Sequence, residues 1–199
     1  MSARYDLFTR MFMPGAVLPA KDKKHQHQAR LQPVGMLHLP SGRVVACDAI
    51  ATIDFMPLSR TVTPGVYPVE ASVVTTTKDE SRIAGVRIVF SSATVSTWEV
   101  ASGGSGYPAE ATSLGLFIDA QTVPALQSYI DDSDSEWWYE PPKTRGKDWQ
   151  VACFTPDDER LETCALFDST AGDGGFVSYW GLDAGGAAVV LVTDFGLIA

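Results

Sequence analysis

Few of the residues on which motif-defined enzymes depend occur in this sequence. Its 199 residues include three cysteines and three histidines, and the histidines all lie within the first 38 residues. No serine stands in a Gly-x-Ser-x-Gly motif, which argues against a hydrolase with a nucleophile elbow. The run "GDGG" lacks the Lys-Ser/Thr of a P-loop, and no two cysteines have the C-x-x-C spacing of a zinc site. These absences exclude the enzyme classes that such motifs define, and we expect no cofactor.

Long apolar runs are also missing. No segment reaches the roughly 20 residues needed to span a membrane. The short apolar run after Arg10 is interrupted by Pro14 and Gly15, so we do not expect a signal peptide either. Three cysteines without the spacing of a disulfide framework are typical of a reducing compartment. We therefore expect a cytoplasmic protein that does not associate with membranes.

Positive charge is in deficit over most of the chain. The net charge is −9, so a nucleic acid is not an expected partner. Residues 1–30 nevertheless carry +4, and the remainder therefore carries −13. An acidic body of this kind suits a basic protein partner, although acidic surfaces also serve solubility alone.

What the sequence does contain is a series of short runs with strand-like composition, separated by turn residues. Hydrophobic residues make up 45% and charged residues 20%, which are ordinary values for a globular domain. A helix is expected after residue 119, with Asp119 as a candidate cap and Val123, Leu126 and Ile130 on one face. The expected strands cover residues 43–49, 65–76, 82–90, 94–101, 149–154, 163–168, 176–183 and 187–195. The sequence therefore predicts an α+β fold, mainly antiparallel β-sheet in a sandwich or strongly bent sheet, with one or two helices.

The charged run "KDKKHQHQAR", residues 21–30, offers little apolar surface. We therefore predict that residues 1–30 form an appended, partly mobile segment outside the core sheet, and that residues 31–199 form a single α+β domain. His25 and His27 have the spacing of a metal-binding pair on a strand, but so polar a segment favours solvated side chains.

Two of the expected strands, 149–154 and 163–168, are predicted to pair across the charged loop between them. In the simplest register Phe154 lies opposite Thr163, and Cys153 lies opposite Cys164. Such a pair is either a cross-strand redox site or two small buried thiols, and a reducing compartment favours two reduced thiols.

The stretch "GDGGFVSYWGLDAGG", residues 172–186, is the best candidate for a binding site. Its glycines and aspartates are typical of turns, so we interpret it as turn, strand and turn. With a period of two residues, Trp180 shares the core-facing side with Phe176 and Leu182, and Tyr179 points the opposite way. Turn chemistry does not account for the adjacent serine, tyrosine and tryptophan. The predicted ligand-binding residues are Asp173, Ser178, Tyr179, Trp180 and Asp183, and Trp137 and Trp138 mark an alternative surface.

Carboxylates are the remaining chemical resource, because several stand at the ends of expected strands. They are Asp48, Glu70, Asp119, Asp173, Asp183 and Asp194. Two or three that converge would form a divalent-cation site or an acid–base pair, whereas strand-end aspartates are mostly turn formers. No residue of the chain is assigned as a metal ligand or as catalytic on this basis.

Six segments in order carry a resemblance to a known family. They are "LPSGRVVACD", "TPGVYPVEASV", "RIAGVRIVF", "WEVA", "GDGGFVSYWGLDAGG" and "LVTDF". Together they resemble the bacterial family catalogued as domain of unknown function 4241, from about Pro33 to Phe195. In that family the middle segment holds an Asp-Ala-Gly run before a Cys-Phe-x-Asp motif. This sequence has "EATSLGLFID" there, which keeps Phe117 and Asp119 but lacks the Asp and the Cys. The resemblance implies no activity.

These observations favour a non-catalytic binding domain that recognises a protein partner or a small-molecule ligand. An acidic domain of this size fits an immunity or anti-defence type of protein, of bacterial or phage origin. The alternative is a metal-dependent hydrolase that uses the strand-end carboxylates. The sequence indicates no oligomeric state.

Overall fold

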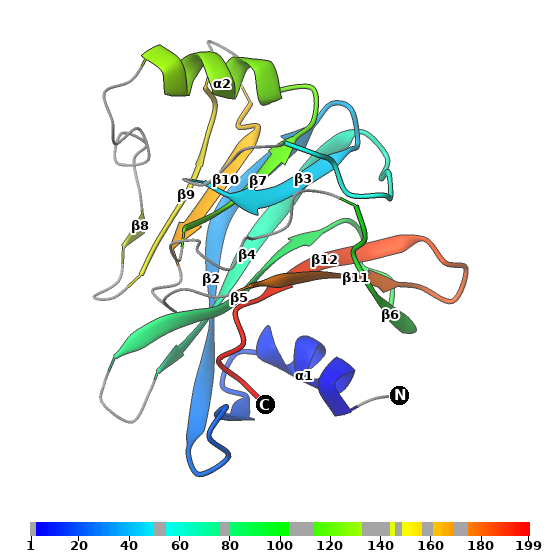
Figure 1. The fold of residues 1–199 in the computed structure, drawn as a ribbon. Helices are drawn as coiled ribbons and strands as arrows, with labels where there is room; N and C mark the ends of the chain where they lie inside the picture. Colours follow the sequence, from blue (N-terminus) through cyan, green and yellow to red (C-terminus); the bar gives the residue numbers. More distant parts are fainter. Residues whose placement is uncertain are drawn as a thin grey trace.

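Two antiparallel sheets and two helices make up the described part of the protein. The computed structural model describes residues 3–49, 55–75, 80–103, 114–132, 144–145, 149–156, 161–168 and 175–199. The helices are α1 (Ala3–Met11) and α2 (Val123–Asp132). This architecture confirms the predicted α+β fold, because every strand pairing is antiparallel and one sheet is strongly curled (Figure 1).

The larger sheet has seven strands. In spatial order they are β1 (Val17–Pro19), β2 (Gln26–Leu39), β4 (Gly65–Thr75), β5 (Ser81–Val89), β12 (Ala188–Asp194), β11 (Val177–Leu182) and β6 (Thr97–Val100). The smaller sheet has five, in the order β3 (Val44–Asp48), β7 (Leu114–Asp119), β10 (Cys164–Asp168), β9 (Gln150–Phe154) and β8 (Thr144–Arg145). The four expected strands after residue 149 thus divide between the two sheets, two in each.

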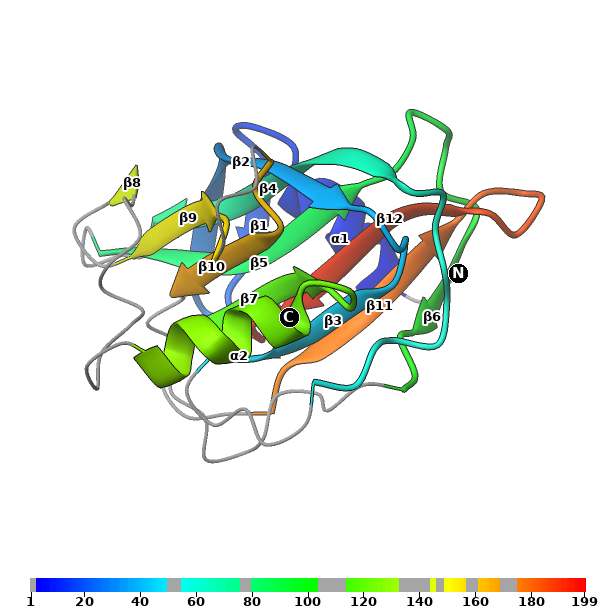
Figure 2. The same cartoon turned by 90° about the horizontal axis from the view of Figure 1, so that it is seen from above.

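The elements stack in four layers with three apolar cores between them. In order they are α1, the seven-stranded sheet, the five-stranded sheet and α2 (Figures 1 and 2). The inter-sheet core contains Trp180, Phe117 and Phe167. The α1 core contains Phe8, Met11 and Tyr179, and the α2 core contains Leu126 and Phe154. Alternation along each strand supplies residues to two of these cores at once.

Helix α2 forms as the sequence predicts. Leu126 is fully buried in the α2 core, and Val123 and Ile130 pack beside it. Asp119 does not cap this helix as predicted, because α2 begins only at Val123. Its carboxylate accepts hydrogen bonds from the backbone N–H of Gln121 and from the N–H and hydroxyl of Ser41. Asp119 therefore fixes the turn after β7 against the residues that precede β3.

The expectation that residues 1–30 stay outside the sheet is wrong for two parts of that segment. Residues 17–19 form β1, and β2 begins at Gln26. His27 and Ala29 are buried on the face covered by α1, while Gln26 and Gln28 are exposed. The polar run is therefore an alternating strand, which needs apolar contact on only one face. The division of the chain at residue 30 stays a prediction, although β2 crosses it.

The predicted pairing of Cys153 with Cys164 is also wrong, by one residue of register. Cys164 lies opposite Phe154, and Cys153 lies opposite Ala165. A shift of one residue turns every side chain to the other face of a sheet. Cys153 therefore lies beside the inter-sheet core, and Cys164 lies in the α2 core. All three cysteines are free.

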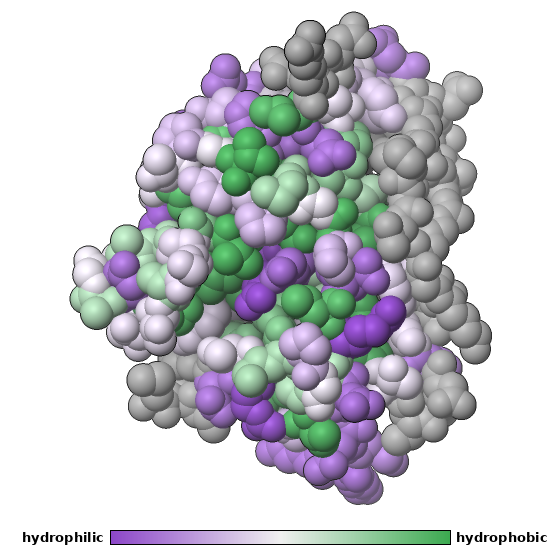
Figure 3. Space-filling model, turned by 180° about the vertical axis from the view of Figure 1, so that it is seen from behind, coloured by the Kyte–Doolittle hydropathy of each residue, from purple (hydrophilic) through white to green (hydrophobic). Residues whose placement is uncertain are grey.

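Neither helix in the described part of the chain has the length and hydrophobicity that crossing a bilayer requires. On the side of the molecule opposite to Figure 1, apolar areas are broken up by hydrophilic ones (Figure 3).

Candidate functional site

The residues predicted from the sequence to bind a ligand lie on β11 and its flanking turns. Ser178 and Trp180 point into the interior between the sheets, where Trp180 is fully buried. The Ser178 hydroxyl lies 2.8 Å from the Thr193 hydroxyl of the neighbouring strand β12. Both residues therefore belong to the inter-sheet packing.

Tyr179 points to the opposite face of the sheet, as predicted. Only 5% of its surface is exposed, because α1 covers it. Its ring centroid lies 4.6 Å from that of Phe8, and the Phe8 ring also packs edge-on against Trp98. Tyr179 thus forms part of the surface on which α1 sits.

Asp183 is placed in the turn that follows β11. Its Oδ1 accepts hydrogen bonds from the backbone N–H groups of Gly185 and Ala187, at 2.8 and 2.9 Å. This is the turn chemistry that the sequence indicates. Asp173, Trp137 and Trp138 lie outside the described residues. The structure thus does not gather Ser178, Tyr179, Trp180 and Asp183 onto one surface.

The strand-end carboxylates are dispersed as well. Glu70 pairs with Arg87 at 2.6 Å, Asp119 holds Ser41, and Asp194 accepts the Gly196 N–H at 2.8 Å. Within the described ranges, no three side chains of the His, Cys, Asp and Glu types stand close enough to hold a metal ion. The described strand-end carboxylates named here therefore each have a separate local partner.

A pocket between α1 and the end of β12 is a candidate site in the described part of the chain. We call it the apolar pocket. Its volume is about 380 Å³, within the range of about 300–1,000 Å³ typical of small-molecule sites. It is lined by Leu7, Phe8, Lys21, Asp194, Gly196, Ile198 and Ala199.

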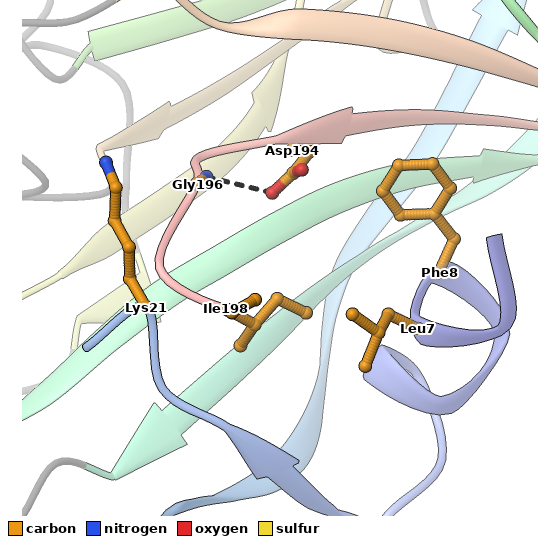
Figure 4. Close-up of a pocket in the computed structure, with 7 residues that line it drawn as sticks. Leu7, Phe8, Lys21, Asp194, Gly196 and Ile198 are labelled. Carbon is orange, nitrogen blue, oxygen red and sulfur yellow. Dashed lines mark hydrogen bonds between the residues drawn. The ribbon is translucent and has the colours of Figure 1, made fainter. Parts of the chain in front are cut away.

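Three separate parts of the chain position these side chains. Figure 4 shows Leu7 and Phe8 of α1 on one side of the segment that follows β12 and Lys21 on the other, with Ile198 between them. Lys21 stands at the start of the β1–β2 turn, and its backbone N–H donates to the Leu197 carbonyl at 3.0 Å. Next to this hydrogen bond, Ala20 and Ile198 form an isolated antiparallel β-bridge. The last residues of the chain therefore lie beside β1.

Helix α1 is docked by specific contacts, which define the wall of the apolar pocket. The Ser72 hydroxyl donates to the Met11 carbonyl at 2.6 Å, and Arg10 donates to the Val17 carbonyl at 2.7 Å. A Cβ at Gly85 would stand 2.6 Å from the Met11 sulfur and 2.8 Å from the Thr193 carbonyl. Because only glycine leaves this space, Met11 can lie against the sheet.

Two charged groups line the apolar pocket and do not pair with each other. Asp194 is 7% exposed, and one of its oxygens is held by Gly196. Lys21 is exposed and forms no ion pair with any residue that the structure describes. Among its side chains the pocket therefore combines an apolar wall with the Asp194 carboxylate and the Lys21 ammonium group.

A second pocket, of about 350 Å³, lies on the other side of α1. We call it the outer pocket. Phe8 borders both pockets, and Arg87, Trp98 and Val190 contribute to the outer one. The Arg87 guanidinium is engaged by Glu70 and lies over the Phe12 ring, 4.5 Å from its centroid. Its charge is therefore already neutralised.

Helix α1 and the apolar pocket were not among the features predicted from the sequence. A signal was available, because Leu7, Phe8, Met11 and Phe12 have the spacing of one apolar helix face. Lys21 lay in the recognised basic run, but nothing in the sequence places it beside Ile198. That proximity comes from the return of the chain after β12.

Comparison with known proteins identifies the family. A family model described as "Protein of unknown function (DUF4241)" matches residues 37–193. The match covers most of the chain, which therefore belongs to this family. Neither the curated proteins nor the solved structures gave a match. All seven residues that line the apolar pocket lie outside the matched segment.

Proposed function

We propose that this member of the DUF4241 family is a non-catalytic binding domain that holds a small molecule in the apolar pocket. The observation that carries the proposal is the composition of that pocket. Leu7, Phe8 and Ile198 supply an apolar surface, and Lys21 supplies a charge that orients a ligand. Mostly apolar walls with a few placed polar groups are characteristic of ligand sites.

The non-catalytic part of the proposal rests on how the charged groups are placed. Acid–base and nucleophilic catalysis need two or more groups within hydrogen-bonding reach of the reacting atoms. In the described part of the chain, Lys21 and Asp194 form no ion pair with each other, and Asp194 is held by a backbone N–H group. The arrangement favours recognition over chemistry.

The proposed setting is the cytoplasm of a bacterium or of a cell infected by a phage. The three free cysteines support a reducing compartment. An immunity or anti-defence protein that sequesters a small signalling molecule would need only a binding site of this kind. The chain has a net charge of −9, so a basic protein is an alternative partner for the same domain.

The proposal is tested with N-phenyl-1-naphthylamine, a neutral apolar dye whose fluorescence rises when it leaves water. We expect the native protein to bind this dye with saturation. Leu7→Trp and Ala199→Trp place an indole at the apolar pocket, and each should weaken dye binding by about tenfold or more.

Ala93→Trp is the matched control, because Ala93 is exposed and lines only the outer pocket. It should leave the apolar-pocket affinity unchanged. Leu7 is largely buried, so its variant is compared with Ala199→Trp, which replaces an exposed residue. Absence of saturable dye binding, or equal loss in all three variants, would overturn the proposal.

A further inference from the structure

Lys21 borders two cavities at once. Beside the apolar pocket lies a recess of about 250 Å³, which we call the polar recess. It is lined by Ala20, Lys21, Asp22, His25, His27, Arg82 and Leu197. Lys21 is the residue that the polar recess shares with the apolar pocket.

Both cavities open on the α1 side of the seven-stranded sheet. Ile83 lies in the inter-sheet core, so its neighbour Arg82 points to the α1 side. Ala29 lies in the α1 core, and His27, two residues before it on β2, shares its face. The recess and the pocket are therefore reached from the same side of the sheet.

The charges around Lys21 are uneven. The Asp22 carboxylate already has several hydrogen-bond partners. Its Oδ2 lies 2.5 Å from the His25 Nδ1, and its Oδ1 accepts the backbone N–H groups of Lys24 and His25. The hydrogen bond from His25 holds the pKa of Asp22 below its usual value, and the bond from the Lys24 N–H adds to this effect. Arg82 faces Glu80 at 3.3 Å. Lys21 also lines the polar recess, and it forms no ion pair with a carboxylate of the described residues.

The two ends of the apolar pocket differ in what they accept. At the end of β12 the lining residues are Asp194, whose carboxylate accepts the Gly196 N–H, and Gly196, so this end offers no cationic side chain. At the Lys21 end, the recess adds Arg82 and the imidazole of His27. His27 is only 9% exposed, and its Nδ1 has no hydrogen-bond partner among the residues the structure describes. A ligand with an apolar body and one anionic end is therefore favoured in a single orientation.

We propose that the ligand is an amphipathic anion, whose apolar body fills the pocket beside Leu7, Phe8 and Ile198 and whose carboxylate or phosphate head lies at Lys21. The polar recess receives the head group, with Arg82 and His27 next to it. This inference rests on the proposed small-molecule function and adds the chemical class of the ligand.

Displacement of N-phenyl-1-naphthylamine tests the class of ligand. Three competitors with the same ten-carbon chain are compared below their micelle-forming concentrations: decanoate, decyl phosphate and uncharged decanol. We expect at least one of the two anions to displace the dye about tenfold or more better than decanol, because a charge-assisted contact is gained. The tighter anion identifies the head group as carboxylate or phosphate.

Lys21→Gln should bring the ratio of anion displacement to decanol displacement close to one. Lys24→Gln is the matched control, because Lys24 is an exposed lysine of the same turn and lines neither cavity. Arg82→Gln should reduce the preference without abolishing it.

Equal displacement by the anions and by decanol would overturn the proposal that the ligand is an amphipathic anion. It would leave the proposed binding of a small molecule in the apolar pocket unaffected. A preference that survives Lys21→Gln would also overturn it. Failure of the dye to bind at all would instead contradict the proposed function, so the two failures are distinguishable.

Discussion

Burial controls the chemistry of the three cysteines. Cys47 and Cys164 are almost fully buried. Burial, with a smaller contribution from the nearby Glu162 carboxylate, raises the pKa of the Cys153 thiol to about 12. Burial likewise raises the pKa of Cys47 well above its usual range, and Asp48 adds to the effect. Because the thiolate is the reactive form, such cysteines are structural residues.

We predict that the native protein reacts slowly with Ellman's reagent at pH 8. The raised pKa values keep Cys47 and Cys153 protonated at that pH, and Cys164 is fully buried and out of reach of the reagent. In denaturant all three cysteines should react, at the rate of an ordinary exposed thiol. Rapid labelling of the folded protein, or a Cys153–Cys164 disulfide after mild oxidation, would contradict this prediction.

Among the secondary-structure elements, α1 depends on close packing of Met11 against Gly85 of the sheet. The helix has nine residues, too few to be stable alone in water. Its stability therefore comes from Leu7, Phe8, Met11 and Phe12, all buried against the sheet. Asp6 in the first turn and Arg10 in the last turn also match the helix dipole.

Gly85→Ala should destabilise the protein through this fit. The added methyl group would meet the Met11 sulfur and the Thr193 carbonyl, and the carbonyl belongs to a fixed strand. We expect the free energy of unfolding to fall by roughly 1–3 kcal/mol. Chemical denaturation of the two proteins measures the difference.

The matched control for this substitution is Gly185→Ala in the exposed turn after β11. The nearest atom to its Cβ would be the Asp183 Oδ1, at 3.3 Å. This variant should change stability much less than Gly85→Ala. If Gly85→Ala had no larger effect than the control, α1 would not be docked on the sheet in the way described.

At the scale of the whole molecule, the inter-sheet core joins the two sheets. Trp180 of the larger sheet and Phe117 and Phe167 of the smaller sheet are all fully buried in it. The α1 and α2 cores each connect one helix to one sheet. A change in the inter-sheet core therefore affects both sheets, whereas a change beneath a helix affects mainly one side.

Trp180→Ala should lower the free energy of unfolding by roughly 3–5 kcal/mol, because a large cavity is left between the sheets. Both sheets should lose stability together, so far-ultraviolet circular dichroism and tryptophan fluorescence should report one shared transition. Val177→Ala on the same strand is the control, because Val177 is 37% exposed and should cost much less. Similar losses in both variants would contradict the assignment of Trp180 to the core.

Local sequence patterns are sufficient to predict many of the helices and strands. Strand alternation, turn residues and the apolar face of Val123, Leu126 and Ile130 correctly predicted most strands, α2 and the α+β class. The same alternation placed Trp180 and Tyr179 on opposite faces of β11. Six ordered segments were also enough to identify the family.

Which faces are covered, and which residues meet, depends on contacts between distant parts of the chain. The register of β9 and β10 depends on packing against two different cores, and a one-residue shift there separated Cys153 from Cys164. The candidate site was hidden for a similar reason, because Leu7, Lys21 and Ile198 come from distant parts of the chain. Local periodicity reports which side of an element is apolar, but it carries no information about which distant segment covers that side.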